Sequence, residues 1–255
     1  MTINCRDIRY AYPTPDGPIL ALDGINLTVQ PEEFLCIVGP SGCGKTTLLK
    51  LVAGLLQPTG GSIEFQNGGR HSGAMVFQEH GLFPWMSVLQ NVCLGPMFKG
   101  ADQDQREREA MVLLRQFGLA DFAAHYPHQL SVGMKQRVSL ARAFITQPSV
   151  LLMDEPFAAL DALNKVVLQE ELLRIWKRYQ TQVIYITHDI DEALLLGDRI
   201  LVMSGKPGVI CEDIPVPLER PRKHDDLAQA EVVACKEHIW RTLETEVRKV
   251  VGSTL

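Results

Sequence analysis

Short runs of apolar residues mark the positions where this chain is expected to form strands. Uninterrupted apolar runs of four or five residues, bounded by turn residues, are typical of strands buried on both faces of a sheet. They occur at 34–38, 150–153 and 183–186, the last followed by Thr187. Nearer the N-terminus the apolar residues alternate with polar ones, which predicts half-buried strands that include Ile25, Leu27, Val29, Ile63 and Phe65.

Helical spacing predominates between and after these runs. Residues 79–147 are predicted to be mainly helical, with the charged run 102–109 on a solvated face. A second amphipathic helix is expected over 168–176. After the proline-rich stretch 215–222, apolar residues return at near-helical spacing, which predicts a C-terminal helix with one apolar face: Leu227, Val232, Cys235, Ile239, Leu243 and Val247.

The first apolar run leads into a glycine-rich loop whose pattern is typical of phosphate binding. Residues 39–46 fit G-x-x-x-x-G-K-[ST] at every fixed position: Gly39, Pro40, Ser41, Gly42, Cys43, Gly44, Lys45 and Thr46. A helix is expected to begin at Thr47, so the pattern has the strand–loop–helix setting that supports it. Its backbone N–H groups and helix N-terminus suit phosphate, Lys45 can reach the β- and γ-phosphates, and Thr46 can bind Mg²⁺. The sequence therefore predicts a nucleoside triphosphate site.

The second apolar run, 150–153, delivers two carboxylates to the end of a predicted buried strand. Asp154 is placed to hold hydrated Mg²⁺, and Glu155 to orient and deprotonate a water that attacks the γ-phosphate. This pair favours hydrolysis over passive nucleotide binding.

Residues 130–137 begin a predicted helix, with Ser131 as its N-cap and its N–H groups available to an anion. The segment Leu130-Ser131-Val132-Gly133-Met134 resembles the signature helix of the ATP-binding cassette (ABC) ATPases. Further family elements follow in order: an adenine-stacking aromatic, a glutamine loop, a D-loop and a switch histidine. They match Tyr12, Gln78, the segment 158–161 ending in Asp161, and His188.

The resemblance covers about residues 3–215 and implies an α/β fold. We expect a phosphate-loop ATPase core with a mixed sheet, an antiparallel β region and an inserted helical subdomain. The expected ATPase domain spans 1–220, with its core at 1–78 and 148–220 and the helical subdomain at about 79–147. Residues 221–255 would form a helical tail.

The resemblance also implies the site and its assembly. Two cassettes face head to tail, so that ATP lies between one phosphate loop and the signature helix of the other subunit. Glu155, His188 and Gln78 would be catalytic, and Thr46, Gln78 and Asp154 would bind Mg²⁺. The ATP-binding set is Tyr12, residues 39–46, Thr47, Ser131, Gly133 and Asp161. The partners would be a second copy or a paired ATPase subunit, an integral membrane permease and, indirectly, an extracytoplasmic substrate-binding protein.

Three positions change this expectation locally. Val132 replaces the first signature glycine, so it is strained if that position needs positive φ and merely bulky if it is helical. Ala158 lacks the hydroxyl common in the D-loop. Cys43 lies among inward-pointing amides beside Lys45, which predicts a favoured thiolate whose alkylation inactivates the ATPase and is slowed by ATP.

Composition limits the class of protein. The chain has 255 residues, of which 46% are hydrophobic and 22% charged, enough to bury a sizeable core. Its formal net charge of −5 gives no support for nucleic-acid binding. No apolar stretch approaches a membrane span, and the N-terminus does not resemble a signal peptide. The six dispersed cysteines read as reduced thiols.

The segment after the glutamine loop, Leu82-Phe83-Pro84-Trp85 followed by Asn91-Val92, together with Arg220-Pro221-Arg222, is similar to the nitrate, sulfonate, taurine and bicarbonate importer branch. We therefore expect the ATPase subunit of a small-anion importer, peripheral on the cytoplasmic face of the inner membrane. Phe83 and Trp85 could instead belong to the subdomain core. The alternative function is a soluble ABC ATPase that acts on nucleic acid or ribosomes.

Overall fold

The computed structural model describes residues 1–66, 73–98 and 100–252, of which 250–252 are described by their backbone alone. The chain divides into two compact units. One contains the chain up to His71 and from Gln182 onward, and the other is Ser72–Thr181. The expected α/β class is confirmed. The domain boundaries stay a prediction, and residues 253–255 of the expected tail lie outside the described residues.

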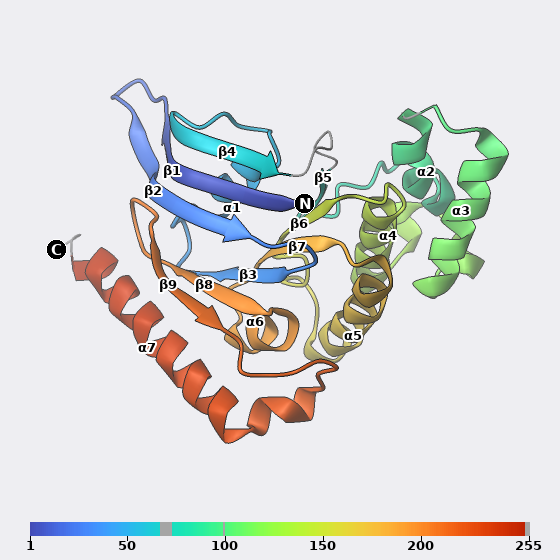
Figure 1. Cartoon of the computed structure of the whole chain (residues 1–255). Helices are drawn as coiled ribbons and strands as arrows, with labels where there is room; N and C mark the ends of the chain where they lie inside the picture. Colours follow the sequence, from blue (N-terminus) through green and yellow to red (C-terminus); the bar gives the residue numbers. More distant parts are fainter. Residues whose placement is uncertain (67–72, 99, 253–255) are drawn as a thin grey trace. The chain divides into compact units, whose positions relative to one another are not determined.

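The first unit contains an antiparallel sheet in the order β2-β1-β4, made of β1 (Thr2–Tyr12), β2 (Ile19–Val29) and β4 (Gly60–Gln66). In β2 the alternating residues Ile25, Leu27 and Val29 are buried, as the period of two predicts. This sheet is the expected antiparallel β region (Figure 1).

The same unit contains strands β7 (Gln182–Ile186), β3 (Phe34–Val38), β8 (Arg199–Met203) and β9 (Ile210–Pro215), in that order. β3 pairs in parallel with β7 and β8, whereas β9 runs antiparallel to β8, so the sheet is mixed. Every residue of β3 and β7 is buried, which explains their continuous apolar runs.

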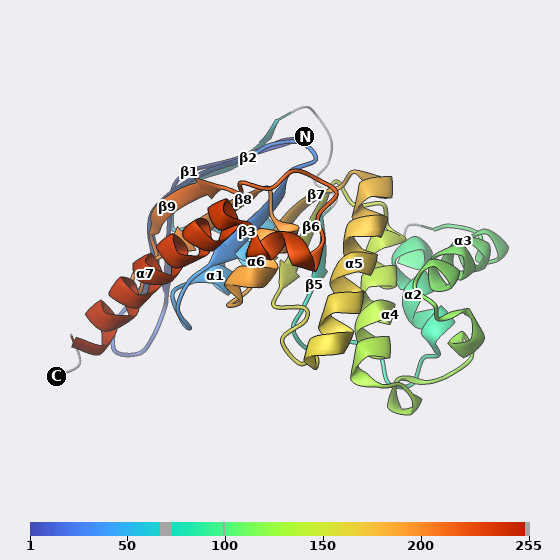
Figure 2. The same cartoon turned by 90° about the horizontal axis from the view of Figure 1, so that it is seen from below.

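Helices cover the strands of this unit. α1 (Lys45–Val52) contacts both β2 and β7, and α6 (Ile190–Leu196) packs on β3. A 3₁₀ helix (His224–Ala228) precedes α7 (Ala230–Gly252), which packs on α6 and β8 (Figures 1 and 2). Of the predicted apolar face, Val232 and Ile239 are buried on α7 and Cys235 and Leu243 are partly buried. Val247 is 43% exposed, and Leu227 lies in the preceding 3₁₀ helix, so the apolar face is shorter than the spacing predicts.

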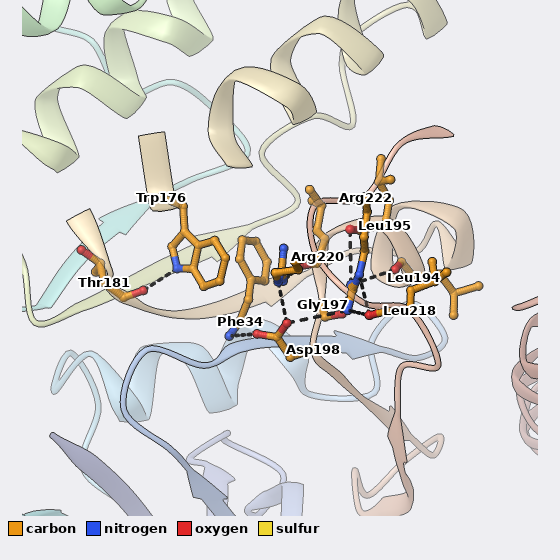
Figure 3. A network of polar contacts seen from close by, with 11 residues as sticks. Phe34, Trp176, Thr181, Leu194, Leu195, Gly197, Asp198, Leu218, Arg220 and Arg222 are labelled. Carbon is orange, nitrogen blue, oxygen red and sulfur yellow. Dashed lines mark hydrogen bonds and ion pairs between the residues drawn. The ribbon is translucent and has the colours of Figure 1, made fainter. Parts of the chain in front are cut away.

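A cluster of two arginines and one aspartate joins the segment after β9 to α6 (Figure 3). Arg222 donates to the carbonyls of Leu194, Leu195 and Gly197, at the C-terminal end of α6, and to that of Leu218. Arg220 donates to the Leu196 carbonyl, and its Nε lies 2.7 Å from Asp198 Oδ1. These guanidinium groups satisfy carbonyls that a helix end leaves without intrahelical partners. We call Arg220, Arg222 and Asp198 the arginine cluster.

The second unit begins with the parallel pair β5 (Gly73–Val76) and β6 (Val150–Asp154). Its helices are α2 (Val88–Phe98), α3 (Gln103–Gln116), α4 (Val132–Phe144) and α5 (Ala162–Tyr179), with 3₁₀ turns at Ala120–Phe122 and Pro127–Gln129. α2, α3 and α4 pack on one another around buried residues such as Phe117 and Phe144. Among residues 1–66, 73–98 and 100–252, every helix is too short or too polar to cross a bilayer.

Candidate functional site

The loop between β3 and α1 is shaped by glycine and closed around a lysine. Gly44 adopts φ 100°, and a Cβ there would lie 2.7 Å from Leu22 Cδ2, so a side chain is excluded both by conformation and by space. Lys45 Nζ donates to the carbonyls of Gly39 and Pro40 at 2.8 and 3.0 Å. Gly44 is also the N-cap of α1, and as a glycine it has no side chain with which to cap that first turn. A helix N-terminus and an ammonium group in this arrangement suit a phosphate.

Tyr12 and Thr47, both predicted ATP-binding residues, lie together in the first unit. Tyr12 ends β1, and its hydroxyl is hydrogen-bonded to Thr47 Oγ1 in α1 at 3.0 Å. The ring of Tyr12 meets that of Tyr10 edge to face, with centroids 4.9 Å apart, and the residue is 38% exposed. The aromatic ring is therefore held beside the phosphate-loop helix with part of its surface available for stacking.

His188 is placed next to the phosphate loop by the register of parallel strands. Ile37 of β3 pairs with Ile186 of β7, and Thr187 N–H donates to the Ile37 carbonyl at 3.2 Å. Gly39 and His188 therefore leave adjacent strands at the same edge of the sheet, where ligands bind in open α/β sheets. His188 is exposed, whereas Thr187 before it is buried.

The second unit repeats this geometry with its own strand pair. Val76 of β5 pairs with Met153 of β6, so Gln78 and the Asp154–Glu155 pair follow adjacent parallel strands at one edge. Asp154 and Glu155 are partly buried, and Gln78 is exposed. Glu155 has φ 44°, a backbone conformation that L-residues rarely adopt and that often occurs at functional sites.

The start of α4 confirms Ser131 as its N-cap, because Ser131 Oγ accepts the Met134 N–H at 3.3 Å. Val132 is the first residue of the helix, is 44% exposed and does not have positive φ. Of the two readings of Val132, the structure supports the one without backbone strain. Gly133 also has no positive φ and is partly exposed.

Asp161, the D-loop residue, caps a helix in the structure. It is the N-cap of α5, and it accepts hydrogen bonds from Asn164 N at 3.1 Å and from Asn164 Nδ2 at 2.6 Å. These bonds, the side-chain one first, lower the pKa of Asp161 below its ordinary value. Its exposed carboxylate is therefore ionised at neutral pH.

Comparison with known proteins identifies the family that combines these features. The sequence model of the family described as ABC transporter matches residues 22–158, which include the phosphate loop, the signature segment and Asp154–Glu155. The chain belongs to the ABC transporter family. It is accordingly an ATP-binding cassette with ATPase activity.

Relatives with curated names support the same assignment. An uncharacterised ABC transporter ATP-binding protein of Methanocaldococcus jannaschii is 44% identical over 91% of this chain and 87% of its own length. The bicarbonate transport ATP-binding protein CmpD of Synechococcus elongatus is 44% identical over 88% of this chain and 83% of its own length. The nitrate import ATP-binding protein NrtD of a Synechocystis strain is 44% identical over 86% of this chain and 84% of its own length.

Solved ABC structures share the fold. A dimeric ATP-binding cassette in a post-hydrolysis state, bound to ADP and Pi, matches with a TM-score of 0.76 and 30% identity. The match covers 85% of this chain and all of that one.

Sequence reasoning missed the side chains that fasten the signature helix α4 to the glutamine-loop segment. Gln136 Oε1 lies 2.6 Å from His80 Nδ1, and Ser139 Oγ donates to the His80 carbonyl at 2.6 Å. Arg142 donates to the carbonyls of Gly81 and His80 at 2.7 and 2.9 Å. The available signal was the spacing of three between Gln136, Ser139 and Arg142, which puts them on one side of α4, and Gln136 and Ser139 are buried there. We call Gln136, Ser139, Arg142, His80 and Gly81 the α4–loop contact.

The prediction of a reactive Cys43 thiolate is wrong. Cys43 is only 1% exposed, and its Sγ is packed so that a Cβ on Gly39 would lie 2.8 Å from it. Burial raises the pKa of the Cys43 thiol above its ordinary value, and the opposing effect of Lys45 is smaller. The sequence position suggested a helix N-terminus next to a cation, but the side chain points into the protein interior. Cys211 is exposed and Cys235 partly so.

Proposed function

We propose that this chain is the ATP-hydrolysing subunit of a membrane importer for a small anion such as nitrate, a sulfonate, taurine or bicarbonate. It would work as a pair of ABC subunits on the cytoplasmic face of the inner membrane, bound to integral permease subunits. An extracytoplasmic protein would deliver the substrate to the permease. The names of the bicarbonate transport and nitrate import relatives support this proposal.

The residues at the two sheet edges divide the chemistry of hydrolysis. Backbone N–H groups of residues 39–46 and the Lys45 ammonium bind the phosphates, with Tyr12 against the adenine. Glu155 accepts the proton of the attacking water, while His188 contacts the γ-phosphate. Ser131 and Gly133 act on the ATP held by the paired subunit, so each complete site needs two chains.

The predicted metal ligands fit Mg²⁺ by their chemistry. The Thr46 hydroxyl, the Gln78 side-chain oxygen and the Asp154 carboxylate are all hard oxygen donors, the type that Mg²⁺ prefers. Thr46 lies in the first turn of α1, and Asp154 ends β6. When bound, Mg²⁺ would neutralise phosphate charge during transfer. The three side chains would hold and orient it.

An exposed aromatic surface after the glutamine loop carries the proposal of a permease partner. Phe83 is 39% and Trp85 69% exposed, and their rings meet with centroids 5.5 Å apart. The alternative assignment of these residues to the subdomain core therefore does not fit their exposure. Large apolar side chains held together on a surface are characteristic of protein-binding sites.

This surface is built on a rigid loop. Asn91, which is fully buried in α2, donates to the carbonyls of Phe83, Met86 and Ser87 and accepts the Phe83 N–H at 2.8 Å. A preorganised loop loses little conformational freedom on binding, which favours a stable interface with a partner. The α4–loop contact joins the segment immediately before it to the signature helix. A partner that displaces Phe83 and Trp85 would therefore displace Ser131 as well.

The test is to replace this surface without touching the nucleotide residues. Full-length chain carrying Trp85→Ala is compared with wild type for co-purification with detergent-solubilised permease subunits encoded beside it. The complex is then reconstituted in liposomes and assayed for ATP-driven uptake of labelled bicarbonate, nitrate and taurine. We expect Trp85→Ala to lose permease binding and uptake while it retains ATP binding.

Trp240→Ala is the matched control, because Trp240 is similarly exposed (62%) but lies on α7. It should bind the permease like wild type. Wild-type uptake in Trp85→Ala would reject this surface as the permease site. An ATPase stimulated by RNA or ribosomes, with no membrane protein bound, would favour the soluble alternative.

A further inference from the structure

The backbone that follows His188 is fastened by a buried hydroxyl group. Thr187 Oγ1 donates to the carboxylate of Glu192 and accepts the N–H of Asp189 at 3.0 Å. Thr187 and Glu192 are 2% and 4% exposed, whereas His188 between the two fastened residues is exposed. The hydroxyl therefore fixes the peptide unit that follows the histidine, next to the exposed His188.

Glu192 is held in a defined place in the first turn of α6. Asp189, the N-cap of α6, accepts the N–H groups of Asp191 and Glu192 at 2.9 and 3.2 Å. Burial and then the nearby Glu192 carboxylate raise the pKa of Tyr185 and of Cys36, which places the carboxylate among the interior side chains of β7 and β3. A buried carboxylate costs free energy unless it is hydrogen-bonded, so the hydrogen bond from Thr187 stabilises Glu192 in this position.

The other end of α6 is also immobilised. The arginine cluster binds the carbonyls of residues 194–197, the last turn of this short helix (Figure 3). On the strand side, Thr187 N–H is bonded to the Ile37 carbonyl of β3. The Glu192 carboxylate and the Thr187 hydroxyl are thus carried by two elements that are each fixed independently.

We infer that Glu192 is a positioning residue for ATP hydrolysis, which holds the Thr187–Asp189 backbone through the Thr187 hydroxyl and so directs the His188 imidazole. This inference rests on the proposed role of His188 at the γ-phosphate. A misplacement of about 1 Å in a reacting group can cost about a hundredfold in rate. Loss of the hydroxyl should therefore lower kcat and leave ATP binding, which the phosphate loop provides, nearly unchanged.

The experiment compares Thr187→Val with Thr187→Ser in the full-length chain. Valine has the shape of threonine but lacks the hydroxyl, and serine restores it. We expect Thr187→Val and Glu192→Leu to lower kcat about tenfold to a hundredfold with KM for ATP within about twofold. Thr187→Ser should retain most of the wild-type kcat. Equal turnover in Thr187→Val and Thr187→Ser would overturn the inference.

Gln182→Leu controls for general destabilisation. Gln182 is buried at the opposite end of β7, and its Nε2 donates to the carbonyls of Val29 and Gln30 at 2.9 and 2.8 Å. It should lower the thermal midpoint of unfolding without the selective fall in kcat. If Gln182→Leu and Thr187→Val lose kcat equally at equal thermal stability, the effect is structural and the inference fails.

A double-mutant cycle with His188→Ala separates this inference from the proposed function. If the Thr187 hydroxyl acts through His188, then Thr187→Val should lower kcat little further in the His188→Ala background. Additive losses would overturn the inference while leaving hydrolysis by His188 intact. Wild-type turnover in His188→Ala alone would instead reject the proposed role of the histidine.

Discussion

Replacing Arg222 with methionine should strongly destabilise the first unit, because the arginine is a buried cation with a carbonyl at nearly every donor. Its side chain is 2% exposed, and it donates to four different carbonyls. Burial lowers its pKa to about 10, so it stays protonated at neutral pH. Asp198, the carboxylate of the cluster, is 3.7 Å from its NH2 and also bonds Arg220.

The magnitude follows from the groups that methionine would leave unpaired. The carbonyls of Leu194, Leu195 and Gly197 would lose a charged donor, and an unsatisfied buried acceptor costs about 1–3 kcal/mol. Methionine also removes the desolvation penalty of the buried charge, which offsets part of this loss of stability. We expect the free energy of unfolding to fall by about 3 kcal/mol. Arg222→Lys should have a free energy of unfolding between those of wild type and Arg222→Met, because an ammonium lacks the planar fork of donors.

Urea unfolding followed by far-ultraviolet circular dichroism measures this effect, with the slope m checked for constancy. The control is Arg241→Met on α7, because Arg241 is 77% exposed and pairs with Glu237 one turn away. Such surface pairs contribute less than about 0.5 kcal/mol. A decrease in the free energy of unfolding of less than about 1 kcal/mol in Arg222→Met would refute the view that the cluster anchors the tail segment.

Three further predictions concern the nucleotide site. Glu155→Gln should keep ATP binding but lower turnover about a hundredfold or more and trap an ATP-bound dimer, seen by light scattering with Mg²⁺-ATP; wild-type turnover would remove Glu155 from its role. Val132→Gly should leave ATP affinity of the monomer unchanged and raise turnover of the assembled complex, since it removes bulk at an exposed helix start; equal or lower turnover would show that valine is already accommodated. Maleimide should label Cys211 well before Cys43 and leave ATPase activity intact at first, as peptide mapping would show; early loss of activity together with label on Cys43 would contradict its burial.

Features that depend on residues close in sequence were predictable. The apolar run 34–38, the glycines of the loop and the following helix determine one another locally, and the structure has each of them. Ser131 as a helix N-cap is a similarly local property, since its side chain bonds a residue three positions on. The central part of the buried face of α7, Val232 and Ile239, followed from helical periodicity.

Features that depend on distant contacts were not predictable from one sequence. Cys43 is at the position where a reactive thiol is expected, but it is buried, and Gly208, 165 positions away, lies so close that a Cβ there would clash with the Cys43 carbonyl oxygen. The α4–loop contact joins residues 56–62 positions apart. In the arginine cluster, proline spacing indicated a linker, whereas burial of Arg222 depends on where α6 ends. In each case a tertiary contact overrides the local pattern.

The α4–loop contact has a mechanical consequence for the signature segment. Three side chains of α4 bind His80 and Gly81, so we expect this helix and the glutamine-loop segment to rotate together. Ser131 lies eleven residues before Arg142, which at 1.5 Å per residue is a distance of about 16 Å along the helix. A tilt of about 10° at the Arg142 end would therefore shift Ser131 by about 3 Å, the length of one hydrogen bond. A small rotation applied at the aromatic surface would thus be sufficient to make or break the proposed contact between Ser131 and a phosphate.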